Sequence, residues 1–203
     1  MCISLTSFEH RIRKLFAERL NPAVCYHNLD HTLSIVDKVN EIGEYHQLDK
    51  EQLENLFFAG WLHDVGYWEG IAIEHEERGA NFAQDFLMEF GLPEARIEVI
   101  CSAIRATKVP QKPRNLMESI ICDADLYHLS SDQFYEQTLL LKQEFEQLNN
   151  QSVDLLGWLR NSEKFMKSHH YHSPYALKFL QPGKDENFQY LLSKIDELAK
   201  ASL

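Results

Sequence analysis

The stretch WLHDVGY, residues 61–67, sets an imidazole beside a carboxylate in otherwise apolar and aromatic surroundings. A buried polar group costs free energy unless it is paired, and a buried charge costs more, so His63 and Asp64 need partners. Neighbouring residues on a helix point about 100° apart, so both side chains reach one cation only if it lies between their directions. Taken alone, the pair is better explained by a core histidine bonded to a carbonyl and an aspartate that caps a neighbouring element.

Two other stretches carry groups that bind metals. In YHNLDHT, His31 falls in the first turn of a helix if Asn28 is the N-cap, and the positive helix end favours the neutral imidazole that binds metals. In CDADLYHL, Asp123 and Asp125 lie in an apolar helix, where a divalent cation is an efficient partner. Residues two apart point to different faces. We therefore expect one aspartate to bind metal and the other to cap or hydrogen-bond, the alternative being that both cap a helix start.

The four residues His31, His63, Asp64 and Asp125 make a set of two imidazoles and two carboxylates. Such a set suits Mn²⁺, Fe²⁺, Co²⁺, Ni²⁺ or Zn²⁺ and leaves positions open for water. Mg²⁺ is less well suited because it prefers more oxygen ligands. The sequence therefore predicts a divalent metal ion as the cofactor.

This constellation resembles the HD superfamily of metal-dependent phosphohydrolases. That superfamily has a histidine on an early helix, then an adjacent His-Asp pair, then a distant aspartate. The resemblance gives these roles to His31, to His63 with Asp64, and to Asp125, which follows an alanine as in that superfamily, rather than to Asp123. It implies a helical fold and hydrolysis of a phosphoester by a metal-activated water.

Further motifs extend the resemblance over about residues 20–176: YHNLDHT, WLHDVGY, EHEERGA, IRATKVPQKP, CDADLYHLSSDQF and FMKSHHYHSPY. Together they resemble a bacterial subfamily of predicted HD phosphohydrolases. Similar domains stand at the N-terminus of membrane-anchored phage-defence effectors that respond to cyclic pyrimidine nucleotides, although those effectors carry a C-terminal membrane segment and this sequence does not. Dinuclear HD proteins carry two further histidines before the last aspartate, whereas here only His75 lies in that interval. We therefore predict one metal ion, the alternative being that a second one binds weakly.

The remaining polar residues of these motifs are assigned to catalysis or substrate binding. Asp64 could orient the attacking water as well as bind metal, and Glu76 or Glu77 could act as an outer base, unless they form only a solvated acidic face. The basic island ATKVPQKPR lies on a proline-rich loop and is a candidate for phosphate contact, although such loops are often only solubilising. The residues assigned to the substrate are Tyr26, Asn28, Arg78, Lys108, Lys112, His128 and His169, and Arg105 and Arg114 are further cationic candidates.

Helices must position these residues, because apolar residues recur at intervals of three and four almost throughout the chain. Thr6 with Glu9 makes a capping box. Asp49 starts a helix that Gly66 ends, and Gly91 ends another. Alternating strand patterns are almost absent, so an all-α fold is predicted. The expected helices lie near residues 8–20, 28–45, 49–66, 74–91, 93–108, 115–129, 131–148, 152–169 and 186–200.

The length of 203 residues fits one domain of ordinary size. We predict a single HD-type helical bundle over residues 1–203. Its core spans about residues 20–176, and an amphipathic helix is appended at about residues 185–200. This last helix either packs on the domain or forms a homodimer contact.

Composition limits the partners. The net charge of −11 argues against a nucleic-acid partner, and no apolar run is long enough for a signal peptide or a membrane span. Four scattered cysteines without a C-x-x-C pair fit reduced thiols in a cytoplasmic protein.

The leading interpretation is a metal-dependent phosphohydrolase that acts on a nucleotide or another small phosphoester, with a nucleotide favoured. The alternative is a non-catalytic nucleotide-sensing module that keeps the metal pocket. A helical protein without metal is the third hypothesis.

Overall fold

The computed structural model describes residues 4–201, which are helical and contain no strand. The all-α fold predicted from the sequence is confirmed. No helix in this part of the chain is long and apolar enough to cross a membrane. The elements are α1 (Leu5–Arg19), α2 (Leu29–Tyr45), α3 (Lys50–Leu62), η1 (Val65–Tyr67), α4 (His75–Glu89), α5 (Glu94–Ala106), α6 (Leu116–Asp125), η2 (Tyr127–Ser130), α7 (Phe134–Asn149), α8 (Leu155–Ser168), α9 (Pro174–Phe179) and α10 (Gln181–Ala201).

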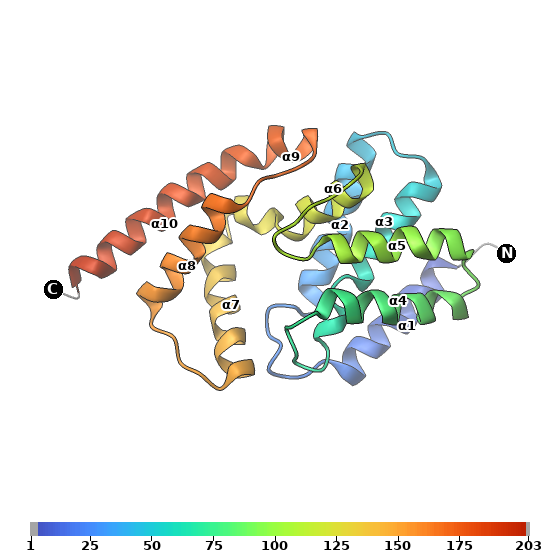
Figure 1. The fold of residues 1–203 in the computed structure, drawn as a ribbon, viewed down its shortest axis with the longest axis horizontal. Coiled ribbons are helices and arrows are strands. Elements are labelled where there is room, and N and C mark those ends of the chain that lie inside the picture. The colour runs from blue at the N-terminus through green and yellow to red at the C-terminus, as the bar shows by residue number, and fades with distance from the viewer. Residues whose placement is uncertain (1–3, 202–203) are drawn as a thin grey trace.

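The helices form two unequal halves (Figure 1). Helices α1 to α6 enclose a large core that includes the fully buried Ile35, Phe58 and Ile100, and each such side chain contributes about 1.5–3 kcal/mol when it leaves water. Helices α7, α8 and α10 enclose a smaller cluster around Leu159 and Leu191. The site described below lies where these two halves meet.

Side chains at the helix starts explain where α2 and α3 begin. The Asn28 side chain accepts a hydrogen bond from the His31 backbone N–H, as an N-cap does. Asp49 and Gln52 form a reciprocal capping box at α3. The expected capping box at Thr6 is wrong, because α1 starts earlier and Ser4 caps it by accepting from the backbone N–H of Ser7.

The chain that follows α3 passes very close to the backbone at the start of α4. The helix ends at Leu62 rather than at Gly66, and the chain turns into η1. A Cβ at Gly66 would lie 2.0 Å from the carbonyl oxygen of His75, so only glycine lets α4 cross here. The crossing sets the first residues of α4 beside His63 and Asp64.

The C-terminal helices differ from the expectation in two respects. The short α9 was not predicted, and α10 begins at Gln181 rather than near residue 185. Leu191 and Ile195 of α10 pack with residues of α8 and η2. This helix therefore packs on its own chain, and a homodimer contact stays a prediction.

Candidate metal centre

Four side chains from three separate segments meet at the junction between α2, α3 and α6. His31 comes from the first turn of α2, His63 and Asp64 directly follow α3, and Asp125 is the last residue of α6. One ligand atom from each lies within 4.8 Å of the others. Nε2 of His63 is 2.9 Å from Oδ2 of Asp64 and 3.6 Å from Oδ1 of Asp125. The structure thus brings together all four residues proposed as metal ligands.

The orientation of these groups fits a cation. Nδ1 of His63 lies 2.8 Å from the carbonyl oxygen of Gly60. With its proton there, the ring donates to that carbonyl and turns the Nε2 lone pair to the cluster, as orienting partners do in metal sites. Oδ2 of Asp64 is buried and has no hydrogen-bond partner among the described residues, although it lies 3.2 Å from Nε2 of His31. A divalent cation would satisfy that oxygen.

The charges in the cluster are strongly coupled. Burial works to lower the pKa of His63, but the charges of Asp64 and Asp125 outweigh it and raise this pKa to about 9. Burial and the charge of Asp64 raise the pKa of Asp125 to about 7, against the effect of His63. Burial lowers the pKa of His31 despite the Asp64 carboxylate beside it, which favours the neutral ring that the sequence led us to expect. The cluster therefore holds a proton at neutral pH, which a metal ion would displace.

The neighbouring aspartate has another role. The carboxylate of Asp123 accepts hydrogen bonds from the backbone N–H groups of His172, at 2.8 Å, and Ser173, at 2.7 Å. It therefore fixes the segment before α9 to α6. Of the two aspartates that the sequence left open, Asp125 lies in the cluster and Asp123 does not.

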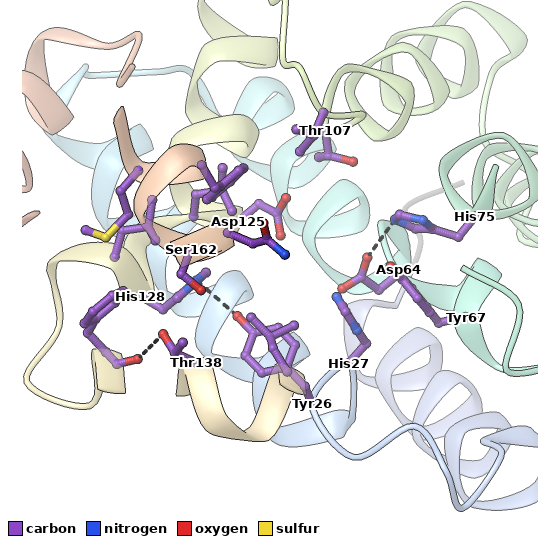
Figure 2. A pocket seen from close by; sticks show the side chains of 18 of the residues that line it. Tyr26, His27, Asp64, Tyr67, His75, Thr107, Asp125, His128, Thr138 and Ser162 are labelled. Atoms are coloured by element: carbon purple, nitrogen blue, oxygen red, sulfur yellow. Dashed lines mark hydrogen bonds and ion pairs between the residues drawn. The ribbon is translucent and has the colours of Figure 1, made fainter. Parts of the chain in front are cut away.

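A histidine and a glutamate that received no role in the sequence analysis lie next to the cluster. Glu144 reaches back from α7 and accepts hydrogen bonds from the backbone N–H groups of Tyr26 and His27 and from Nδ1 of His27. The His27 ring stacks on Tyr67 with a centroid distance of 3.9 Å, and Figure 2 shows it beside Asp64. Burial lowers the pKa of His27, but the charges of Asp64 and Glu144 outweigh it and raise this pKa.

The proposed outer bases separate in the structure. His75 places Nε2 3.6 Å from Oδ1 of Asp64 (Figure 2), and the buried Glu76 beside it lines the same cavity. Glu77 faces away and forms two hydrogen bonds with Arg105, at 2.8 and 2.9 Å. Only Glu76 is thus placed to act on a ligand at the cluster.

A cavity of about 360 Å³ opens from Asp64 and Asp125 and runs between η2, α7 and α8. This volume is within the range of small-molecule sites, roughly 300 to 1,000 Å³. Tyr26 and His128 line it and pair through the Tyr26 hydroxyl and Nδ1 of His128, 3.0 Å apart. Burial lowers the pKa of His128 to about 3, so the ring is neutral. Figure 2 looks into this space.

Most of the other residues assigned to the substrate do not line this cavity. Arg78 donates to the carbonyl oxygens of Gly66, Ile71 and Ile73, and thereby holds the loop between η1 and α4. Lys108 and Lys112 are exposed outside the cavity.

Two further assigned residues lie nearby but outside the cavity. Asn28 caps α2 and lines a separate cavity with His31. His169 lines another, smaller one with Phe165, and burial lowers its pKa to about 3. Tyr26 and His128 are therefore the assigned substrate residues that face the cavity.

The family model of the HD domain matches residues 28–130, which contain all four residues of the cluster. The chain therefore belongs to the HD domain family. Its fold is similar to the crystal structure of a predicted HD superfamily hydrolase from an uncultured Thermotogales bacterium. The TM-score is 0.58 and the sequence identity 16%, over 98% of this chain and 99% of the other. No curated protein matches the sequence.

Proposed function

We propose that the protein is a metal-dependent phosphohydrolase that hydrolyses a small phosphoester. The observation that carries the proposal is the cluster of His31, His63, Asp64 and Asp125, with an unpartnered carboxylate oxygen, at one end of a cavity of small-molecule size. Membership of the HD domain family supports the same conclusion. A divalent cation bound there would lower the pKa of a water molecule and polarise a phosphoryl oxygen.

The chain's own residues supply the remaining functions. Asp64 lines the cavity. Its carboxylate accepts a hydrogen bond from the attacking water and thereby orients this water in line with the phosphorus. Glu144 holds His27 in place, and the charges of Asp64 and Glu144 raise the pKa of His27 despite its burial. His27 therefore donates a proton to the ester oxygen as the alcohol leaves. Glu76 lies beside His75 and receives the proton of the water.

A panel assay tests the proposal. The purified protein is loaded separately with Mn²⁺, Fe²⁺, Co²⁺, Ni²⁺ and Zn²⁺, its metal content is measured, and phosphate release is followed from nucleoside mono-, di- and triphosphates, cyclic pyrimidine nucleotides and simple phosphate esters. The cyclic pyrimidine nucleotides are included because of the resemblance to phage-defence effectors. We expect turnover with at least one metal and one ester. Absence of turnover from protein that demonstrably holds metal would overturn the proposal.

The same panel separates the alternative of a sensing module. A module that binds nucleotides without hydrolysing them shows a raised melting temperature with an unchanged nucleotide. A nucleotide that both stabilises the protein and is consumed excludes the sensing role.

A further inference from the structure

The cavity has an apolar end that the metal cluster does not explain. Away from Asp64 and Asp125 it is walled by large side chains of η2, α7 and α8. We call this end the apolar arm and define it by Leu129, Phe134, Leu141, Trp158, Phe165 and Met166. The arm and the cluster belong to one continuous cavity, so a ligand whose phosphate lies at the cluster places its organic group in the arm.

The polar groups on the walls of the arm are already engaged with the backbone. Nε1 of Trp158 donates to the carbonyl oxygen of Thr138 at 2.9 Å, and the Thr138 hydroxyl donates to that of Phe134 at 2.8 Å. The Ser162 hydroxyl donates to the carbonyl oxygen of Trp158 at 3.2 Å. Asn161 also lines the cavity, but it is exposed. A nucleobase in the arm would find few groups to replace its hydrogen bonds to water, which costs affinity, whereas a hydrocarbon would lose none.

The charges in the cavity limit the number of phosphoryl groups. No lysine or arginine is among the described residues that line it, while Asp64, Glu76 and Asp125 are acidic. Enzymes that bind polyphosphates place several cations around them. Here a bound metal ion would be the main positive charge, and it would face three carboxyl groups. This balance suits one phosphoryl group and disfavours a di- or triphosphate.

We propose that the apolar arm binds the hydrocarbon part of the substrate, which is an ester of one phosphoryl group with a hydrophobic alcohol. This inference rests on the proposed phosphohydrolase function and narrows its substrate class. In the reaction a bond forms between the water oxygen and phosphorus, and the bond between phosphorus and the ester oxygen breaks. The electron pair stays on that oxygen, which takes a proton and leaves as the alcohol, so the products are phosphate and the alcohol.

Binding of non-hydrolysable probes tests the arm independently of turnover. Mn²⁺-loaded protein is titrated calorimetrically with methyl-, butyl- and octylphosphonate, and with analogues of AMP and ATP in which carbon replaces the ester and bridging oxygens. Each methylene that enters an apolar site strengthens binding by about fourfold, so affinity should rise along the phosphonate series. Butylphosphonate should bind more tightly than either nucleotide analogue. An affinity that does not depend on chain length, or tighter binding of the nucleotide analogues, would overturn the inference.

A turnover comparison distinguishes failure of this inference from failure of the proposed function. Kcat/KM is measured for 2-naphthyl phosphate, AMP and ATP with the same metal. A preference for 2-naphthyl phosphate supports both proposals. Efficient hydrolysis of AMP or ATP in preference to 2-naphthyl phosphate would support the phosphohydrolase function and contradict the apolar substrate. If phosphonate binding depends on alkyl-chain length but no ester is hydrolysed, the apolar arm is supported as a binding site and the enzymatic function is contradicted.

A matched pair of variants locates the effect in the arm. Leu141 and Leu139 are half-buried leucines of α7, but only Leu141 lines the cavity. Leu141→Gln should reduce octylphosphonate affinity by about tenfold, because a polar group replaces part of an apolar wall. Leu139→Gln should leave it unchanged, and Leu141→Met should restore most of it. Melting temperatures show that each variant is folded, and equal effects of the two glutamines would contradict the assignment.

Discussion

The two ends of the cavity differ in chemistry and in origin. The metal end is built from imidazoles and carboxylates of residues 31–125, inside the HD domain match and beside the large core. The apolar arm is built mainly from α7 and α8, outside that match and beside the smaller hydrophobic cluster. On the proposed function, the part that matches the family would supply the reactive groups, and the C-terminal helices would shape what reaches them. Substrate choice could then change without any change at the metal ligands.

The largest expected effect is at the metal end. Asp64→Ala removes the central carboxylate and leaves His31 and His63 without it. We expect metal affinity to fall by more than about 100-fold, because even losing a group that only orients a ligand costs about 10- to 100-fold. Metal content after gel filtration measures this. Asp123→Asn is the control, and it should keep its metal. A fully loaded Asp64→Ala protein would refute the ligand assignment.

The next largest effect is expected at the contact between Glu144 of α7 and His27, which lies beside the metal end. Glu144→Gln removes a negative charge that raises the pKa of His27, so kcat should fall by about 100-fold while metal content stays the same. The pKa of His27 should fall, and the pH optimum should move to lower pH with it. The control Glu136→Gln lies on the same helix but is exposed. Unchanged kcat and pH profile in Glu144→Gln would show that His27 only packs there.

The pH dependence of metal binding should be intermediate. The pKa of His63 is raised to about 9 in the metal-free protein, so a proton competes with the metal at every pH below this value. Apparent Mn²⁺ affinity should rise by about tenfold per pH unit from about pH 7 to about pH 9. Below about pH 7 it should fall more steeply, because Asp125 also becomes protonated. Mn²⁺ titrations at several pH values measure how affinity changes with pH. An affinity that does not change above pH 7 would contradict competition between the metal ion and a proton on His63.

The smallest effect is expected at the basic loop. Lys108 and Lys112 are exposed and lie outside the cavity. Replacing both by alanine should change KM for a phosphate monoester by less than about twofold, as surface substitutions do. A tenfold rise in KM would restore the interpretation that this loop holds the phosphate, and it would weaken the contrast between a cation-poor cavity and its reactive end. Steady-state kinetics at fixed metal concentration decides the matter.

Local patterns predicted much of the helical structure. Caps such as Asn28 and Asp49 act through atoms three residues away, and the sequence shows both partners. The cluster could be predicted because two of its members are adjacent and because buried charges need partners. The short α9 could not, because six residues carry too little periodicity to predict a helix.

Long-range contacts could not be read from the sequence. Glu144 lies 117 positions from His27, and no local pattern connects an ordinary glutamate on an amphipathic helix with a distant histidine. The contacts of the cationic residues could not be predicted for the same reason. The sequence shows that Arg78 and Arg114 are positive, but it does not show that the first binds three carbonyl oxygens and the second binds Glu118.

The close approach at Gly66 has a consequence for how variation in this protein would be read. A methyl group there would push the carbonyl of His75 outward, and the start of α4 would move away from Asp64 with it. In a library of all single substitutions selected for activity, this position should lose its variants as completely as the ligands do, although it contributes no reactive atom. A mutational map would therefore mark Gly66 as catalytic, although its role is to leave room for the backbone of α4.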